Sequence, residues 1–255
     1  DFTASVNGVI NFFGAEFCLY DNADVLISCN TTGTFTNIPY GSYCIKAHDN
    51  CTDTTITRCF SASPPPISIG NNVQISNNTT LNLGNGATGT ARQCAGNITV
   101  DAGSTLSMNV SGSVMTNTLT VLGNMNLAGT LTLSSSGGGD IKVGGDWNFT
   151  AATGVFNSNS RAVFFTGSAL QTITRSASGT LNFDYFLNQN SGSGIKLGSL
   201  TSINVNGSGN GLQLTGTGTG NTLDLNGNAL TLGTGTNIQL SGTQTITSAS
   251  GTGTV

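Results

Sequence analysis

The sequence predicts an all-β protein in which a small antiparallel β-sandwich is followed by a right-handed parallel β-helix, or β-solenoid. Two observations point to this fold class. From about residue 67, a triplet of an aliphatic, a polar and another aliphatic residue recurs, and its copies mostly start 6 to 11 residues apart. Residues 1–63 lack this repeat and hold five of the six cysteines. Because such short intervals leave no room for helices between strands, stacked three-strand coils are the expected architecture.

Residues 1–63 are predicted to form the sandwich, because short β-prone runs alternate there with turn-forming Asn, Asp and Gly. A domain of this size buries little apolar surface, so disulfide bridges would contribute much of its stability. The expected strands are 2–6, 16–19, 25–29, 33–36, 42–47 and 54–60.

The cysteines of this region are placed for bridges across hairpins. The expected pairs are Cys18–Cys29, Cys44–Cys59 and Cys51–Cys94. The first two pairs flank the turn-forming residues 21–24 and 49–53, and the third would join the two domains. Zinc is not expected, because the sequence has no closely spaced Cys-x-x-Cys pair. Disulfides indicate an oxidising compartment.

Residues 35–47 read Phe-Thr-Asn-Ile-Pro-Tyr-Gly-Ser-Tyr-Cys-Ile-Lys-Ala and are followed by Asp49 and Cys51. This stretch resembles the closing strand and turn of prealbumin-like or Cna-B-like surface modules. The resemblance implies an Ig-like or prealbumin-like sandwich for residues 1–63. Gly41 would permit the tight turn, and Tyr43 and Ile45 would point inward on the next strand.

Residues 64–66, Pro64-Pro65-Pro66, are expected to form a stiff, extended linker. Residues 67–255 then carry the repeat, in which the aliphatic residues point into the core and the middle residue points to solvent. We expect coils of roughly 18 to 24 residues. The triplets start at residues 67, 73, 81, 98, 119, 125, 131, 141, 147, 195, 203, 212, 223, 230 and 238.

One part of the repeat has a more specific pattern. Gly-Gly-Asp-Trp-Asn-Phe at 144–149 is followed by Gly-Val-Phe-Asn-Ser at 154–158, Ala-Val-Phe-Phe-Thr-Gly at 162–167 and Gln-Thr-Ile-Thr at 171–174. A further segment, 183–197, reads Phe-Asp-Tyr-Phe-Leu-Asn-Gln-Asn-Ser-Gly-Ser-Gly-Ile-Lys-Leu. These segments resemble repeats of large Bacteroidetes surface proteins. The resemblance implies an adhesin-like protein exported by type IX secretion and linked to cell adhesion or gliding motility.

Charged residues are scarce and scattered. They make up 7% of the chain, with a net charge of −4. No basic patch is present, so a nucleic acid is not an expected partner, and no apolar run is long enough for membrane insertion. Asp140, Asp146, Asp184 and Asp224 do not form the close carboxylate pair that glycosidases require. His48 is the sole histidine and no Gly-x-Ser-x-Gly motif occurs, so we expect no catalytic residue, no metal and no cofactor.

Aromatic residues gather between positions 147 and 186. Most of them would fill a wide coil, but the neighbouring pairs at 164–165 and 185–186 must each place one ring outward on a regular strand. We expect Phe165, Tyr185 and Trp147 to contact a glycan or a protein partner. Thr54 follows Asp53 in a short pattern that resembles the O-glycosylation acceptor of Bacteroidetes.

Together these features predict a non-enzymatic, extracellular segment of a bacterial surface protein that acts as a stalk or fibre in attachment or assembly. The alternative is a β-helix protein that binds or degrades a polysaccharide. The final Gly-Thr-Gly-Thr-Val reads like the middle of a repeat. We therefore expect the β-helix to continue, or to dock end to end with another molecule, because stacked strands expose an open edge.

Overall fold

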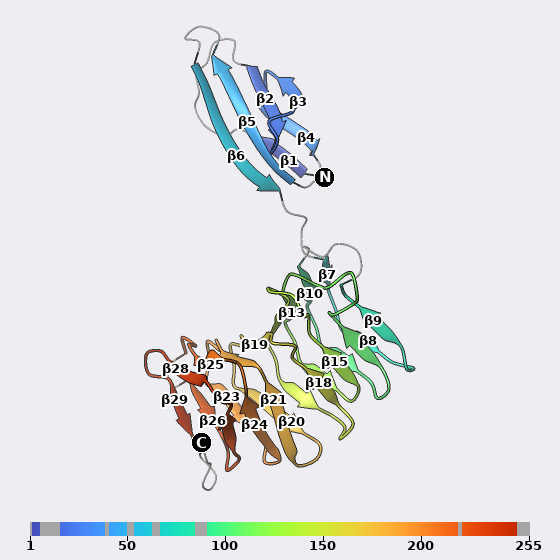
Figure 1. Ribbon diagram of the computed structural model, residues 1–255, viewed down its shortest axis with the longest axis vertical. Coiled ribbons are helices and arrows are strands. Elements are labelled where there is room, and N and C mark those ends of the chain that lie inside the picture. Colours follow the sequence, from blue (N-terminus) through green and yellow to red (C-terminus); the bar gives the residue numbers. More distant parts are fainter. Residues whose placement is uncertain are drawn as a thin grey trace. The chain divides into compact units, whose positions relative to one another are not determined.

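The computed structural model (Figure 1) describes residues 2–5, 16–38, 41–49, 54–62, 67–84, 91–218 and 221–248, which form strands and turns and contain no helix. The chain divides into two compact units, Asp1–Pro65 and Pro66–Val255. The boundary falls within the proline run expected to be a linker, and residues 63–66 lie outside the described residues. The predicted fold class, an antiparallel N-terminal unit followed by a parallel β-solenoid, is confirmed.

The N-terminal unit contains two antiparallel sheets. β1 (Phe2–Ser5) pairs with β4 (Thr34–Ile38). The second sheet has the order β3 (Leu26–Asn30), β2 (Glu16–Asp21), β5 (Gly41–Asp49) and β6 (Thr54–Ala62). Phe35 and Ile38 of β4 pack against Leu19 of β2 and Tyr43 and Ile45 of β5 in one buried cluster. The two sheets therefore face one another as a small sandwich.

Two of the three predicted disulfides are confirmed. Cys18–Cys29 joins β2 to β3, Cys44–Cys59 joins β5 to β6, and each pair lies directly opposite in its antiparallel ladder. These cross-links join two of the three neighbouring strand pairs in the four-stranded sheet, which would otherwise depend on a small core.

The third predicted bridge, from Cys51 to Cys94, is wrong. Cys94 is a free cysteine that is 2% exposed, and its thiol donates a hydrogen bond to the Asn71 carbonyl at 3.1 Å. It lies in register with Ile69 and Val121 at an inward position of the solenoid, so it behaves as a small apolar core residue. Cys51 lies outside the described residues.

The solenoid has three faces, and every strand pairing between its coils is parallel. The first face contains β7 (Ile67–Ile69), β10 (Arg92–Cys94), β13 (Leu119–Val121), β16 (Ile141–Val143), β19 (Ala162–Phe165), β22 (Tyr185–Asn188), β25 (Gly209–Leu214) and β28 (Thr236–Leu240). The second contains β8 (Val73–Ile75), β11 (Ile98–Val100), β14 (Met125–Leu127), β17 (Trp147–Phe149), β20 (Gln171–Arg175), β23 (Gly194–Leu197), β26 (Thr222–Asp224) and β29 (Thr245–Thr247). The third contains β9 (Thr80–Asn82), β12 (Thr105–Ser107), β15 (Thr130–Thr132) and β18 (Val155–Asn157), and then β21 (Gly179–Phe183), β24 (Thr201–Val205) and β27 (Leu230–Leu232).

The registers between strands set the coil length. Ile67 pairs with Arg92, Arg92 with Leu119, and Leu119 with Ile141, so these coils hold 25, 27 and 22 residues. The later coils fall in the same range of 22 to 27 residues. The predicted 18 to 24 residues is too short for several coils, because connections such as residues 108–118 between β12 and β13 are long.

The predicted alternation is confirmed along the first two faces. In β13, Leu119 and Val121 are buried and Thr120 lies between them on the outer side, and β11, β14, β16 and β17 repeat this pattern. One apolar cluster runs through all the coils. Each fully buried aliphatic side chain in it contributes about 1.5–3 kcal/mol, so the repeated triplet supplies the main stabilisation of this unit.

The third face is interrupted halfway along the solenoid. β18 ends one four-stranded sheet and β21 begins a separate three-stranded sheet, while the other two faces continue without a break. Aromatic rings fill the core at this level. Trp147 packs edge-on against Phe156 at 5.1 Å, and Phe183 packs edge-on against Phe186 at 5.2 Å. Most of the aromatic residues between positions 147 and 186 thus lie in the core at the level where the third face is interrupted.

Candidate contact surface of the solenoid

A column of side-chain oxygens joins the coils at the corner between the first and second faces. Asn72 accepts the main-chain N–H of Asn97 at 2.8 Å, Asn97 accepts that of Asn124 at 2.8 Å, and Asn124 accepts that of Asp146 at 2.7 Å. Asp146 then accepts the N–H of Thr172 at 2.7 Å. The corner residues therefore satisfy the main-chain donors that the turn leaves without strand partners.

A glycine precedes each of the next three column residues after Asn72. A Cβ atom added to Gly96 would lie 2.3 Å from the Asn72 side-chain oxygen, and one added to Gly145 would lie 2.2 Å from that of Asn124. The glycine is therefore required for close approach of the coil below rather than for an unusual backbone angle. The Gly-Asn or Gly-Asp pair before an aliphatic triplet is a sequence signal of this corner that the triplet analysis missed.

A second polar column lies on the outer side of the second face. The Asn126 amide donates to Thr99 at 3.3 Å, the Asn148 amide donates to Asn126 at 3.0 Å, and the Thr174 hydroxyl donates to Asn148 at 2.7 Å. The middle residues of the triplets thus bond to one another along the coil axis. These outward side chains of the second face are therefore already hydrogen-bonded to one another.

All five carboxylates of residues 67–255 take part in contacts between or within coils. Asp101 accepts the Gln74 amide, Asp140 accepts the N–H of Ala162, and Asp146 accepts the N–H of Thr172. Asp184 accepts both the Ser158 hydroxyl and the N–H of Ser160 at 2.6 Å. Asp140 and Asp184 each precede a first-face strand, two coils apart, whereas Asp146 precedes a second-face strand and Asp224 lies within one. Each of the four already accepts a hydrogen bond.

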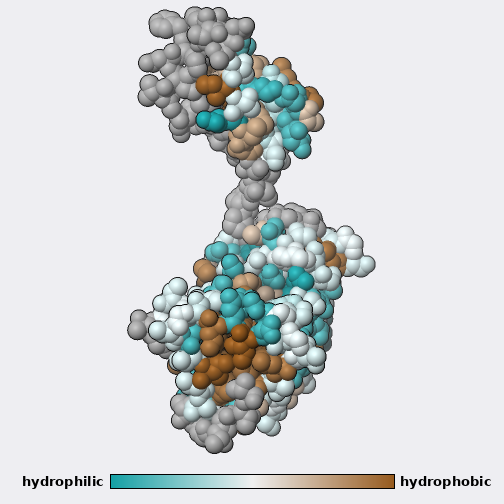
Figure 2. Space-filling view, turned by 60° about the vertical axis from the view of Figure 1, so that its left-hand side comes forward, coloured by the Kyte–Doolittle hydropathy of each residue, from teal (hydrophilic) through white to brown (hydrophobic). Residues whose placement is uncertain are grey.

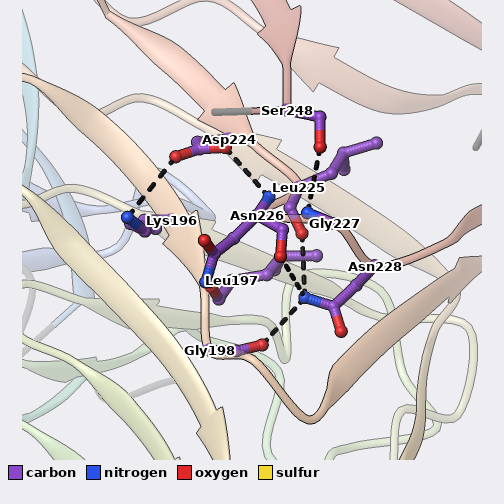
Figure 3. Close-up of polar contacts among 9 residues, drawn as sticks. All are labelled: Lys196, Leu197, Gly198, Asp224, Leu225, Asn226, Gly227, Asn228 and Ser248. Atoms are coloured by element: carbon purple, nitrogen blue, oxygen red, sulfur yellow. Dashed lines mark hydrogen bonds and ion pairs between the residues drawn. The ribbon is translucent and has the colours of Figure 1, made fainter. Parts of the chain in front are cut away.

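Asp224 belongs to a tight turn that Figure 3 shows in detail. Its carboxylate lies 3.7 Å from the Lys196 ammonium group of the preceding coil and accepts the N–H of Asn226 at 2.9 Å. Asn226 and Gly227 both have a positive φ, 51° and 82°, and the Asn228 amide donates to the Gly198 carbonyl of the preceding coil at 2.9 Å. Asn and Gly suit this left-handed turn because they tolerate such angles best.

Two of the three aromatic residues expected at the surface are instead buried. Trp147 and Phe165 are both 0% exposed and point into the core, so neither can contact a partner. The register explains both results, since Phe165 aligns with the buried Val143 and Trp147 aligns with the buried Met125. Phe164, the neighbour of Phe165, is the ring that points outward.

Two partly exposed aromatic residues and one lysine define a candidate contact surface on the first face. We call this surface the first-face strip: Lys142, Phe164 and Tyr185. The Lys142 ammonium lies 5.7 Å from the centre of the Phe164 ring, within the range of a cation–π contact. Tyr185, the expected residue that does remain partly exposed, lies against Gly207, where an added Cβ would come within 2.7 Å of the ring. Both rings therefore have a neighbour on this face, and both residues are partly exposed.

The other predicted sites add no chemistry. Thr54 begins β6, but its side chain lies outside the described residues, and Asp53 is not described either. The His48 ring nitrogen lies 3.1 Å from the Thr55 hydroxyl on the neighbouring strand, a cross-strand contact. Cys18 and Cys29 lie close to the Glu16 carboxylate, yet their sulfur atoms form a disulfide and are not thiolate ligands.

Comparison with family models, with curated proteins and with solved structures found no match for this chain. In the described part of the chain, we find no helix with the length and apolar character that a membrane crossing requires.

Proposed function

We propose that this chain is a non-enzymatic segment of an extracellular surface protein, in which the solenoid is a structural stalk that presents the first-face strip to a glycan or protein ligand. The observation that supports it best is that all five solenoid carboxylates contact a group of a neighbouring coil, four through hydrogen bonds and Asp224 through its ion pair with Lys196. General acid–base catalysis needs a carboxyl group free to exchange protons with a substrate. The same groups here accept hydrogen bonds that the fold requires.

Two further observations support an extracellular location. Both disulfides lie in the small N-terminal unit, where cross-links offset a limited core, and such bridges persist in oxidising compartments. Outward positions on the solenoid are mainly Thr, Asn, Gln and Ser, which suits a surface exposed to variable ionic conditions. A bacterial adhesin of the type IX secretion class, as the resemblance of the segments between residues 144 and 197 implies, is our proposal for the parent protein.

The alternative, a polysaccharide-binding solenoid, has one observation in its favour. Phe164 and Tyr185 lie on the same face of consecutive coils, and aromatic rings stack well against sugar rings. A glycan is therefore the first ligand class to test. Binding of fluorescently labelled chain to an array of glycans and matrix proteins is the primary measurement.

Variants of the first-face strip and a matched control test whether the strip itself binds the ligand. We expect Phe164→Ala and Lys142→Ala to lower the array signal about tenfold, since truncation of a central aromatic contact often has an effect of this size. Gln93→Ala, on the outer side of the same face in β10, is the control and should retain binding. If the chain binds no glycan and no protein, the proposal that the first-face strip contacts a ligand is wrong. Release of reducing ends from a polysaccharide, lost in Asp146→Asn, would establish an enzyme instead.

A second copy of the chain is the other partner that we propose, at the coil that contains β28 and β29. Among the described residues β28 and β29 are the end strands of their sheets, Ile238 and Ile246 are only partly buried, and Leu240 is 51% exposed. Figure 2 shows apolar side chains gathered on this part of the solenoid. Sedimentation velocity over a range of concentrations should reveal association that Leu240→Lys weakens, and a strict monomer at high concentration would exclude this contact.

A further inference from the structure

Arg92 occupies a position of the solenoid that is apolar in the coils that follow. It is the first residue of the triplet in β10, and it pairs with Leu119 of the next coil, which in turn pairs with Ile141. Leu119 and Ile141 are 2% and 0% exposed. The alternation therefore turns the arginine side chain toward the interior of the solenoid, where a charged group is costly unless it is paired.

The guanidinium group of Arg92 has few partners within the chain. Its Nε and Nη2 atoms both donate to one neutral acceptor, the Leu83 carbonyl, at 3.3 and 3.1 Å. Its Nη1 atom is buried and has no hydrogen-bond partner among the described residues. A guanidinium group carries five N–H donors, so at least the two on Nη1 are unused.

The solenoid supplies no carboxylate to neutralise this cation. In the described part of the chain Arg92 forms no ion pair, and each of the five solenoid aspartates contacts a different group. Residues 85–90, which lie outside the described residues, read Asn-Gly-Ala-Thr-Gly-Thr and contain no acidic side chain. An anion that binds Arg92 must therefore come from outside the solenoid.

Arg92 lines a cavity of about 220 Å³ within the first two coils. The lining is mostly apolar and includes residues of all three faces, among them Ile69 of β7, Val73 of β8 and Leu81 of β9, together with Leu83. Ile69 is 45% exposed, and the other three are only partly buried although they pack against the core. A ligand in this cavity would therefore cover apolar surface that the chain leaves accessible.

The volume and the charge together define the ligand. An apolar cavity of roughly 150 Å³ holds benzene, so by proportion this one holds a chain of about eight carbon atoms. A guanidinium group binds a carboxylate through two parallel hydrogen bonds, which match its planar geometry. A carboxylic acid with an aliphatic chain of this length suits both parts of the cavity.

We infer that the first two coils bind a medium-chain aliphatic carboxylate, with the carboxylate at Arg92 and the chain against Val73, Leu81 and Leu83. The arginine side chain has several rotatable bonds, so a rotation of its end brings Nη1 to the ligand. The C-terminus of a polypeptide fits less well, because its last amide groups need hydrogen-bond partners that a mostly apolar lining does not supply. The cavity is separate from the first-face strip, so its test is independent of the proposed function.

The test is isothermal titration calorimetry of the full chain with octanoate, for which we expect a dissociation constant of about 1 mM or lower. Two compounds with the same chain, 1-octanol and octylammonium, replace the carboxylate by a neutral and by a positive group. Acetate keeps the carboxylate without the chain. Each of the three should bind about tenfold more weakly than octanoate or not at all, because each lacks one of the two contacts.

Arg92→Leu restores an apolar residue at this position of the repeat, so the fold should persist while the affinity for octanoate falls about tenfold or more. Arg92→Lys keeps the charge without the planar fork and should bind with intermediate affinity. Arg161→Leu is the matched control and should bind as the unmodified chain does. Arg161 is also partly exposed, donates to the Asn159 carbonyl and precedes β19, three coils further along. Far-ultraviolet circular dichroism checks that each variant is folded.

Equal affinity of the unmodified chain and Arg92→Leu for octanoate would overturn the inference, because the charge would then play no part. Equal affinity for octanoate and 1-octanol would overturn it for the same reason. Absence of binding at about 10 mM octanoate, both in calorimetry and as a shift in thermal unfolding, would also overturn it. Tighter binding of N-acetyl-leucine than of octanoate would contradict the ligand class and assign the cavity to a polypeptide C-terminus.

Discussion

The side-chain oxygen of Asn124 accepts the main-chain N–H of Asp146, one coil further along, at 2.7 Å. This bond is one link of a column that starts at Asn72 and ends at the N–H of Thr172. Strand ladders hold the faces of a solenoid together, but its corners need separate partners for their main-chain groups. The column supplies these partners at one corner over five successive coils.

Removal of one column oxygen should destabilise the solenoid measurably. Asn97→Ala leaves the N–H of Asn124 without its acceptor and should lower the free energy of unfolding by about 1–3 kcal/mol. Asn97→Asp keeps an oxygen in the same place and should retain most of the stability. Urea unfolding followed by circular dichroism measures both. Equal losses for the two variants would show that the amide group, and not the acceptor, is what the corner needs.

The glycine before a column residue should not tolerate a side chain. In Gly145→Ala the new Cβ would meet the Asn124 oxygen and the Gly123 carbonyl carbon, and we expect a loss of about 1–3 kcal/mol from overpacking. Gly70→Ala is the control, because nothing lies within 4 Å of its Cβ position and the equivalent residue one coil later is Ala95. Thermal unfolding of the two variants compares them directly. A Gly70 variant as unstable as the Gly145 variant would contradict the explanation.

The neighbouring residues Phe164 and Phe165 should differ in their effects, Phe165 on stability and Phe164 on ligand binding. Phe165→Ala removes a ring that is 0% exposed and packs against Phe186 at 4.8 Å, so it should cost about 3–5 kcal/mol. Phe164→Ala truncates an outward ring and should cost about 1 kcal/mol or less. Unfolding in guanidinium chloride tests stability and array binding tests function. A reversed order of the two losses would mean that β19 lies with its other side toward the core.

The thiol of Cys94 should be unreactive in the folded chain. Because it is 2% exposed, a bulky maleimide reagent should label it only after denaturation. Peptide mapping by mass spectrometry identifies the labelled cysteine without interference from the others. A peptide cross-linked between Cys51 and Cys94 in non-reduced protein would contradict the free thiol.

Particular residues show how far sequence reasoning reaches. Cys18–Cys29 and Cys44–Cys59 were predictable because a hairpin places the residues flanking its turn directly opposite one another. Cys94 was assigned to a bridge although the triplet Arg92-Gln93-Cys94 already occupies a strand position. The wrong outward assignments of Phe165 and Trp147 have different causes. Two adjacent rings fix only that one points outward, and which one depends on the register with the neighbouring coil. Trp147 occupies the first position of a triplet, which the alternation already placed inward.

The sequence by itself determined the fold class, the change of architecture near residue 66 and two disulfides, because all three depend on local alternation and short-range spacing. Only the tertiary structure decided the contacts between coils. Residues 22 to 28 positions apart come into register there, which places Asn124 beside Asp146 and Phe164 beside Lys142. It also decided that β3 is the end strand of the four-stranded sheet, since the order of strands in a sheet is not encoded in any one strand. Those relationships depend on packing between segments distant in the chain, and a local pattern does not contain them.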